Sequence, residues 1–389
     1  MSLFHFLLVV KRKGDENRMP CVQPNQTQQV CLILVFNIFT QQSSSEVVCG
    51  PCSPTTTFDP ATGDLTIILS FTVVYTVTIT DNFQLNCTIQ SVLLNLANRI
   101  YVANGLDDTV SVIDGATNTV IATISVGDAP TDVAVNPDTN RIYVTNQADN
   151  TVSVINGATN TVIATVLVGD NPVLAAVNPD TNRIYVANLF DNTVSVINGA
   201  TNTVIATVPV GDGPTGVAVN PATNRIYVTN GFDNTVSVID GATNTVIATV
   251  LVGEGPQDLA VNPITNRIYV GNPLDNTVSV INGATNTVIA TVPVGDFPVG
   301  VAVNPITNRI YVANLFDNTV SVIDGSTNTV IATIPAGSSS ILVAVNPDTN
   351  RIYVTNQTDN TVSVIDGSTN TIIATIAVGD GPVGVDVNP

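Results

Sequence analysis

Acidic residues return at a fixed spacing along the C-terminal three quarters of this chain of 389 residues. Six of them stand at multiples of 42 residues from one another: Asp128, Asp170, Asp212, Glu254, Asp296 and Asp380. Carboxylates brought together from neighbouring repeats can hold a hard cation such as Ca²⁺. An Asp in a Gly-Asp-Gly-Pro stretch can instead close its own turn by accepting hydrogen bonds from nearby backbone amides. The spacing leaves both interpretations open, and Asp128, Asp170 and Asp212 are the first candidates for a calcium site.

Catalytic side chains other than carboxylates are missing from the same region. Residues 96–389 contain no His, Cys, Lys, Trp or Met. Within that region this excludes histidine-based acid–base catalysis, Ser-His-Asp triads, cysteine nucleophiles, Schiff-base lysines and haem ligation by His. Carboxylate chemistry with a divalent metal remains. Nearly identical repeats disfavour it, because an active site needs unequal surroundings.

Charge and hydropathy exclude two further classes of partner. The formal net charge is −19, the opposite sign from a surface that binds nucleic acid or an anionic membrane. No apolar run reaches the roughly 18–20 residues needed to span a bilayer. Val, Ile and Thr dominate the composition and Gly, Pro and Asn interrupt them, which is typical of an all-β protein.

An internal repeat of 42 residues carries these acids. Its seven copies are marked by an Arg-Ile-Tyr triplet, with the arginines at Arg99, Arg141, Arg183, Arg225, Arg267, Arg309 and Arg351. The copy at 224–263, NRIYVTNGFDNTVSVIDGATNTVIATVLVGEGPQDLAVNP, contains four β-strand patterns. Asp-Gly and Asn-Gly mark a tight hairpin, and the Pro of Asn-Pro marks a strand end. Four short strands in about 40–50 residues are the spacing of a β-propeller blade.

The repeat also resembles a known family. The pattern RIYVTN, NTVSVID, TNTVIATVPVGDGP, GVAVNP is similar to the YVTN-type β-propeller repeat and covers about three quarters of the chain. The resemblance implies a propeller of the kind found in archaeal surface-layer proteins and many secreted bacterial proteins. It implies no single chemistry, because propellers host many unrelated functions.

The end of the chain indicates how the ring closes. The 294 residues from 96 to 389 are seven lengths of 42. The first copy is preceded by CTIQSVLLNLAN (87–98), a poor match to the innermost strand GVAV, whereas the chain ends on VGVDVNP. We therefore predict an all-β, seven-bladed β-propeller with four strands per blade, closed by the C-terminal strand pairing beside residues 99–104. A truncated gene is the alternative.

The loops are predicted to lie on two faces. The loop between the second and third strands and the connection between blades share one face, which we call the top face. The other two turns share the bottom face. The bottom turns balance seven Arg against seven Asp, whereas the top loops hold sixteen acidic and no basic residues. The sixteen are the six above, the seven repeat aspartates Asp107, Asp149, Asp191, Asp233, Asp275, Asp317 and Asp359, and Asp108, Asp132 and Asp258. We expect the top face to attract cations or a basic partner.

Four further features complete the candidate residues of the propeller. Phe190, Phe232, Phe297 and Phe316 lie in top loops, where they either line an apolar ligand surface or cover the blade ends. Asp386 replaces the Ala of the other six inner strands, either as a site in the central channel or as a residue solvated in a looser terminal strand. The repeat arginines are predicted to reach bottom-turn Asp or Asn side chains. The repeat tyrosines are predicted to pack between blades.

The N-terminal quarter differs from the repeats. Residues 1–18 form a tail or a mis-assigned start and make a poor secretory signal, because the basic residues follow the apolar run. The sequence leaves open whether translation starts at Met1 or Met19. Residues 19–95 are predicted to form a small β domain, with the strand pattern LTIILSFTVVYTVTI at 65–79. It contains all five cysteines, as candidates for structural disulfides or a Cys₄ zinc site: Cys21, Cys31, Cys49, Cys52 and Cys87.

These observations favour a non-enzymatic interaction module on a cell or spore surface or outside the cell. We expect the acidic top face to bind a protein or glycan partner without a cofactor, Ca²⁺ being the one candidate ion. Residues 19–95 would anchor or oligomerise the chain. The alternative is a metal-dependent hydrolase of the lactonase-like propeller type that uses top-face carboxylates.

Overall fold

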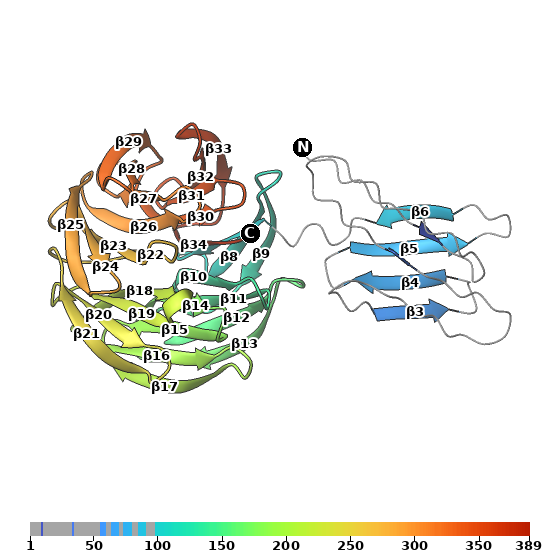
Figure 1. Cartoon of the computed structure of the whole chain (residues 1–389), viewed down its shortest axis with the longest axis horizontal. Coiled ribbons are helices and arrows are strands. Elements are labelled where there is room, and N and C mark those ends of the chain that lie inside the picture. Colours follow the sequence, from blue (N-terminus) through green and yellow to red (C-terminus); the bar gives the residue numbers. More distant parts are fainter. Residues whose placement is uncertain are drawn as a thin grey trace. The chain divides into compact units, whose positions relative to one another are not determined.

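The computed structural model describes residues 98–389 throughout and, before them, the backbone of six strands (Figure 1). The chain divides into two compact units, residues 1–95 and 96–389. In the first unit β1 (Val9–Val10) and β2 (Ile33–Leu34) pair in parallel. An antiparallel sheet follows, in the order β3 (Thr55–Asp59), β4 (Asp64–Leu69), β5 (Val73–Ile79) and β6 (Leu85–Gln90).

One prediction for the N-terminal unit can be compared with these strands. The alternating stretch at 65–79 forms two antiparallel strands, β4 and β5, with Leu65 opposite Val77. The disulfide and zinc candidates lie outside the described side chains, as does the tail at 1–18 apart from the backbone of β1.

The second unit is a ring of seven four-stranded antiparallel sheets (Figure 1). From the inner to the outer strand, blade 1 is β34 (Pro382–Asn388), β7 (Arg99–Asn104), β8 (Thr109–Asp114) and β9 (Thr119–Ser125). Blade 2 is β10 (Pro130–Asn136), β11 (Arg141–Asn146), β12 (Thr151–Asn156) and β13 (Thr161–Leu167). Blade 3 is β14 (Pro172–Asn178), β15 (Arg183–Asn188), β16 (Thr193–Asn198) and β17 (Thr203–Pro209).

The remaining blades repeat this order. Blade 4 is β18 (Pro214–Asn220), β19 (Arg225–Asn230), β20 (Thr235–Asp240) and β21 (Thr245–Leu251), with the 3₁₀ turn η1 (Pro221–Thr223) after β18. Blade 5 is β22 (Leu259–Asn262), β23 (Arg267–Asn272), β24 (Thr277–Asn282) and β25 (Thr287–Pro293). Blade 6 is β26 (Pro298–Asn304), β27 (Arg309–Asn314), β28 (Thr319–Asp324) and β29 (Thr329–Pro335). Blade 7 is β30 (Ser340–Asn346), β31 (Arg351–Asn356), β32 (Thr361–Asp366) and β33 (Thr371–Ala377).

The C-terminal strand closes the ring as predicted. β34 pairs antiparallel with β7, which places Asp386 opposite Tyr101. A hydrophobic cluster joins the first and the last blade, because Ile100 and Val102 of blade 1 pack with Tyr353 of blade 7. The all-β, seven-bladed fold predicted from the repeat is confirmed.

Asparagine explains the tight turns of each blade. Asn140, Asn150 and Asn160 of blade 2 adopt left-handed backbone angles, with φ of 49°, 57° and 53°. Asn tolerates this region better than other residues with a side chain, because its short polar group bonds the local backbone. In blade 2 each of these Asn residues is the last of the four residues that connect two strands.

The core lies between blades, where the repeat tyrosines pack as predicted. Tyr101 is fully buried in a cluster with Val133 and Ile142 of the next blade. The repeat arginines were predicted to reach a bottom-turn Asp or Asn, and Arg99 Nη1 does donate to Asn160 Oδ1 of the next blade, at 3.5 Å. Arg99 Nη1 donates to the carbonyl of Gly157, in a bottom turn of the next blade, at 2.7 Å. The same bond joins Arg183 to Gly241, Arg225 to Gly283, Arg267 to Gly325, Arg309 to Gly367 and Arg351 to Gly115.

Neither unit offers a membrane-spanning helix in the part of the chain that the structure describes.

Candidate functional site

The top-face connections are held by hydrogen bonds from the loop beside them. The carboxylate of Asp149 accepts a bond from the backbone amide of Asp128 at 2.8 Å. All seven blades repeat this bond at 2.7–2.8 Å, and Ser338 takes the place of the acid in blade 7. The Asx residue that follows the repeat aspartate bonds the next amide, as in Ala129 to Asp108 at 2.8 Å. The repeat aspartates are therefore turn residues with a defined structural task.

The six acids that recur at multiples of 42 residues have solvent-exposed side chains. Asp128, Asp170, Asp212, Glu254, Asp296 and Asp380 are all exposed. Two of them accept a bond from a neighbouring loop, Asp170 from Asn150 at 3.0 Å and Asp380 from Asn360 at 2.6 Å. Among the described residues, no three His, Cys, Asp or Glu side chains form a group that could hold a metal ion. Calcium binding stays a prediction.

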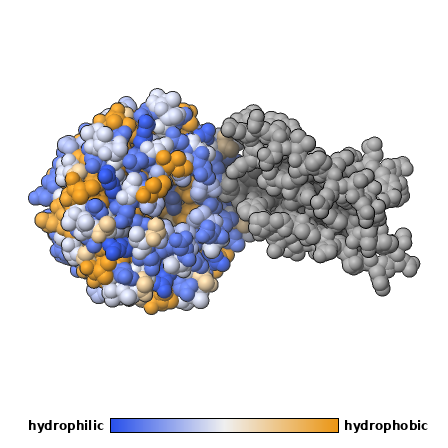
Figure 2. Space-filling model, in the orientation of Figure 1, coloured by the Kyte–Doolittle hydropathy of each residue, from blue (hydrophilic) through white to orange (hydrophobic). Residues whose placement is uncertain are grey.

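Apolar side chains stand beside these acids on the top face. Phe190, Phe232 and Phe316 are 61–69% exposed, and Leu106 and Leu274 occupy the same loop position in two other blades and are also exposed. Phe316 stacks on Phe297 with ring centroids 4.5 Å apart. Phe297 has a φ of 59°, a left-handed angle that is unusual for a large side chain. Hydrophobic and hydrophilic residues are interspersed on the face of the propeller shown in Figure 2.

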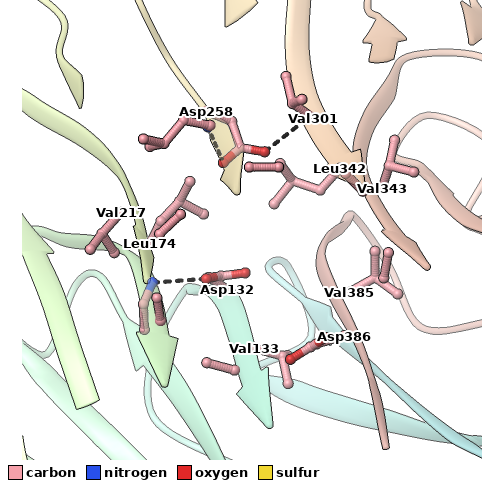
Figure 3. A pocket seen from close by; sticks show the side chains of 18 of the residues that line it. Asp132, Val133, Leu174, Val217, Asp258, Val301, Leu342, Val343, Val385 and Asp386 are labelled. Atoms are coloured by element: carbon pink, nitrogen blue, oxygen red, sulfur yellow. Dashed lines mark hydrogen bonds between the residues drawn. The ribbon is translucent and has the colours of Figure 1, made fainter. Parts of the chain in front are cut away.

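A second candidate site lies in the central channel. The inner strands of all seven blades enclose a cavity of about 340 Å³ (Figure 3). Val, Ala and Leu line it, together with three carboxylates: Asp132, Asp258 and Asp386. Asp132 and Asp258 were predicted to lie in top loops. That was wrong for Asp132, which belongs to β10. Asp258 does lie in the connecting loop, directly before β22, but both side chains line the channel.

Each channel carboxylate joins two adjacent inner strands. Asp132 accepts a bond from the amide of Ala175 at 2.9 Å. Asp258 accepts one from Val301 at 2.8 Å, and Asp386 one from Val135 at 2.7 Å. The donor belongs to the next blade in every case. These amides lie on the inner edge of the blades, where no further strand pairs with them.

Burial raises the pKa of all three channel carboxyls. It raises the pKa of Asp132 well above its usual value, and the negative charges of Asp258 and Asp386 raise it further. It raises the pKa of Asp258 to about 7 and that of Asp386 to about 6. The amide hydrogen bonds act in the opposite direction in each case, because they favour the ionised form.

Comparison with known proteins agrees with this geometry. A family model described as a YNCE-like beta-propeller matches residues 77–182. The repeat pattern, the seven closed blades and this match agree on one assignment. The chain folds as a seven-bladed β-propeller, and its repeats are similar to the YVTN type. A search of curated proteins finds no match.

Solved structures similar to this propeller share its fold at low sequence identity. The hydrazine synthase of Kuenenia stuttgartiensis has a TM-score of 0.61 and 20% identity, over 67% of this chain and 90% of the other. A functionally unknown protein from Desulfotomaculum acetoxidans has a TM-score of 0.67 and 17% identity, over 75% of this chain and 99% of the other. The dihydro-heme d1 dehydrogenase NirN, in complex with DHE, has a TM-score of 0.55 and 16% identity, over 72% of this chain and 64% of the other. At such identities the likeness shows the fold alone.

The channel carboxylates break the sevenfold symmetry of the propeller. Asp386 belongs to blade 1, Asp132 to blade 2 and Asp258 to blade 5. Asp386 stands out in the sequence because it departs from Ala, and the copies also differ from one another at the position of Asp132. That position reads Asp132, Leu174, Gly216, Asp258, Gly300, Leu342 and Gly384. The difference among the copies at this position was the signal that could have separated Asp132 and Asp258 from the other predicted loop acids.

Proposed function

We propose that the YVTN propeller is a non-enzymatic binding module that holds a basic protein partner against its top face. One observation carries the proposal: exposed carboxylates and exposed large apolar side chains alternate on the same loops of several blades. Of the sixteen acids predicted there, removing Asp132 and Asp258 leaves fourteen, still without a basic residue. This surface supports a partner that combines Lys or Arg with apolar side chains.

Rigidity of the loops supports the same proposal. The repeat aspartates and the Asx residues after them fix the backbone of each connection through two hydrogen bonds, as at Asp128 and Ala129. A surface that is already ordered loses less conformational entropy when a partner binds. As part of the proposal we place the module on a cell surface or outside the cell, following the resemblance to surface-layer and secreted propellers.

The alternative expectation, a metal-dependent propeller hydrolase, stays a prediction without further support. The described side chains offer no group of three or more ligands for the metal that such an enzyme would use.

A defined peptide tests the proposal with the full chain. The probe is a fluorescent peptide of alternating Lys and Leu or Phe, and its control has Glu in place of every Lys. We expect the basic peptide to bind, with an affinity that falls as salt is added, and the acidic peptide not to bind. Equal binding of the two peptides, or displacement of the basic peptide by neutral oligosaccharides, would contradict a basic protein partner.

Matched variants on the two faces locate the binding surface. Phe190→Ser with Phe232→Ser removes exposed apolar groups from the top face, and Ile264→Ser with Ile306→Ser removes equally exposed ones from bottom turns. We expect roughly a tenfold loss of affinity, about 1.4 kcal/mol, from the first pair alone. A similar loss from the bottom-turn pair would overturn the assignment to the top face.

A further inference from the structure

The channel cavity presents its charge at two opposite poles. Asp386 and Asp132 belong to neighbouring blades, whereas Asp258 lies three blades from each of them around the ring of seven. Figure 3 shows Asp258 on one side of the opening and Asp132 and Asp386 on the other. Leu174, Val217, Leu342 and Val343 lie in the wall around them. The cavity is therefore acidic at both ends of one diameter and apolar between them.

No cationic side chain among the residues that line the cavity compensates these charges. The cavity lining contains no Arg, Lys or His, and its only ionisable groups are the three carboxyls. Asp132 is only 7% exposed and points into the cavity. A carboxylate can accept about four hydrogen bonds, and backbone amides satisfy only part of that capacity. Buried charges in proteins are normally paired with a counter-charge, so an external cation would complete this site.

The lining selects the kind of cation. A metal ion is disfavoured because the three carboxyls do not form a group that could hold one. A quaternary ammonium is disfavoured because no aromatic side chain lines the cavity. A sugar would leave its hydroxyl groups against Val, Ala and Leu. Primary ammonium groups carry three donors each and suit carboxylates, and a methylene chain suits the apolar wall. A volume near 340 Å³ is at the small end of ligand pockets.

We propose that the central channel binds a linear aliphatic diamine, with one ammonium group at Asp258 and the other between Asp132 and Asp386. The ligand spans the channel, and its methylene chain packs against the apolar wall. This site is separate from the top face and does not rest on the function proposed for that face.

Calorimetric titration of the full chain at about pH 8 tests the proposal. The probes are the unbranched diamines with three to six methylene groups, each compared with the monoamine of equal length. We expect one diamine length to bind at least tenfold more tightly than its monoamine, because only a diamine reaches both poles. Equal affinity of diamines and monoamines at every length, or no binding of any diamine at about 10 mM, would overturn the proposal.

Two charge-matched variants assign the binding to the channel. Asp258→Asn removes one pole while keeping the shape of the side chain, and Asp212→Asn removes one exposed top-face charge. We expect Asp258→Asn to lower diamine affinity to the monoamine level and Asp212→Asn to leave it within about twofold. Equal losses in both variants would show general attraction to an acidic protein and sink the assignment.

A measurement on the unmodified protein provides a check that does not depend on the folding of a variant. Titrations at about pH 6.5 in buffers of different ionisation enthalpy count the protons released on binding. A dication in the channel favours the ionised carboxylates, whose pKa burial raises, so we expect net proton release. Binding without proton release would place the diamine on the exposed acids and contradict the channel site.

Discussion

The carboxylate of Asp386 accepts a 2.7 Å hydrogen bond from the backbone amide of Val135, a residue 251 positions earlier in the chain. This bond links the inner strand of blade 1, supplied by the C-terminal segment, to the inner strand of blade 2. Asp132 and Asp258 make the same kind of link in two other blades. The channel carboxylates thus join blades through neutral backbone donors and keep their charge directed at the cavity.

Asp386→Ala is expected to stabilise the protein at about pH 8. Ala stands at this position in the other six blades, so the fold accommodates it. The variant loses one hydrogen bond but removes a buried charge whose pKa is raised to about 6. Since one pKa unit equals about 1.4 kcal/mol, we expect a net gain of about 1–2 kcal/mol at pH 8. At about pH 4 the Asp386 carboxyl is protonated in the folded state, so the variant only loses a hydrogen bond. We therefore expect a small loss of stability there instead of the gain. Urea unfolding at both pH values measures the change, and a loss at pH 8 would refute this account.

Stability is expected to fall as pH rises from about 4 to 7. The pKa values of Asp132, Asp258 and Asp386 are raised by burial in the folded state, so the folded protein keeps protons that the unfolded chain releases. Stability therefore declines through this window, and it levels off only above the folded-state pKa values of these carboxyls. Thermal unfolding of the unmodified protein and of Asp132→Asn/Asp258→Asn/Asp386→Asn measures the effect. The triple variant should lose most of the slope, and an unchanged slope would assign it to the overall charge of −19.

A loss of stability is expected on the acid side of the same profile. Hydrogen bonds from Ser326 and Ser368 lower the pKa of Asp324 and Asp366 in bottom turns. The ionised carboxylates stabilise the folded protein at pH values above the pKa of the unfolded chain. This stabilisation is lost as the pH falls through the lowered pKa of the folded state. Ser326→Ala/Ser368→Ala should flatten the decline below about pH 4 and leave the slope between pH 4 and 7 unchanged. An effect of this variant above pH 5 would contradict the assignment.

Asp149→Ala is expected to destabilise the protein more than Asp128→Ala, although each removes one top-face charge. Both side chains are exposed, but the carboxylate of Asp149 holds the backbone amide of Asp128. We expect a loss of about 1 kcal/mol for Asp149→Ala and less than about 0.5 kcal/mol for Asp128→Ala. Asp149→Asn keeps an acceptor and should recover most of the loss. Chemical denaturation measures all three, and equal losses for the two alanine variants would contradict the turn role.

Gly384→Ala is expected to strain the contact between blades 1 and 2. A Cβ atom at Gly384 would lie 2.4 Å from the Cα of Asp132, a backbone atom that cannot move aside alone. Overpacking of this kind costs about 1–3 kcal/mol. At Gly105 the nearest atom would be 3.2 Å away, so Gly105→Ala is a matched control with a smaller expected loss. Equal unfolding midpoints for the two variants would show that the inner strands yield more easily than the geometry indicates.

Residues within one repeat determined most of the fold. The Asn residues of the turns, the alternating strands and the buried tyrosines act between neighbours in sequence or in the adjacent blade, so a repeat of 42 residues encodes them fully. The number of copies and the VGVDVNP segment then predicted seven blades closed by β34. The acidic top face followed from the same reasoning, because the position of a loop in the repeat fixes its face.

The tertiary structure alone decided the channel. A periodic pattern treats every copy as equivalent, and it placed Asp132 and Asp258 with the loop acids that surround them in sequence. Only the closed ring shows that Asp132 lies in an inner strand, and that Asp132 and Asp258 line the same cavity as Asp386. Contacts between distant repeats depend on how many blades close the circle and how closely their backbones approach, and no single repeat carries that information.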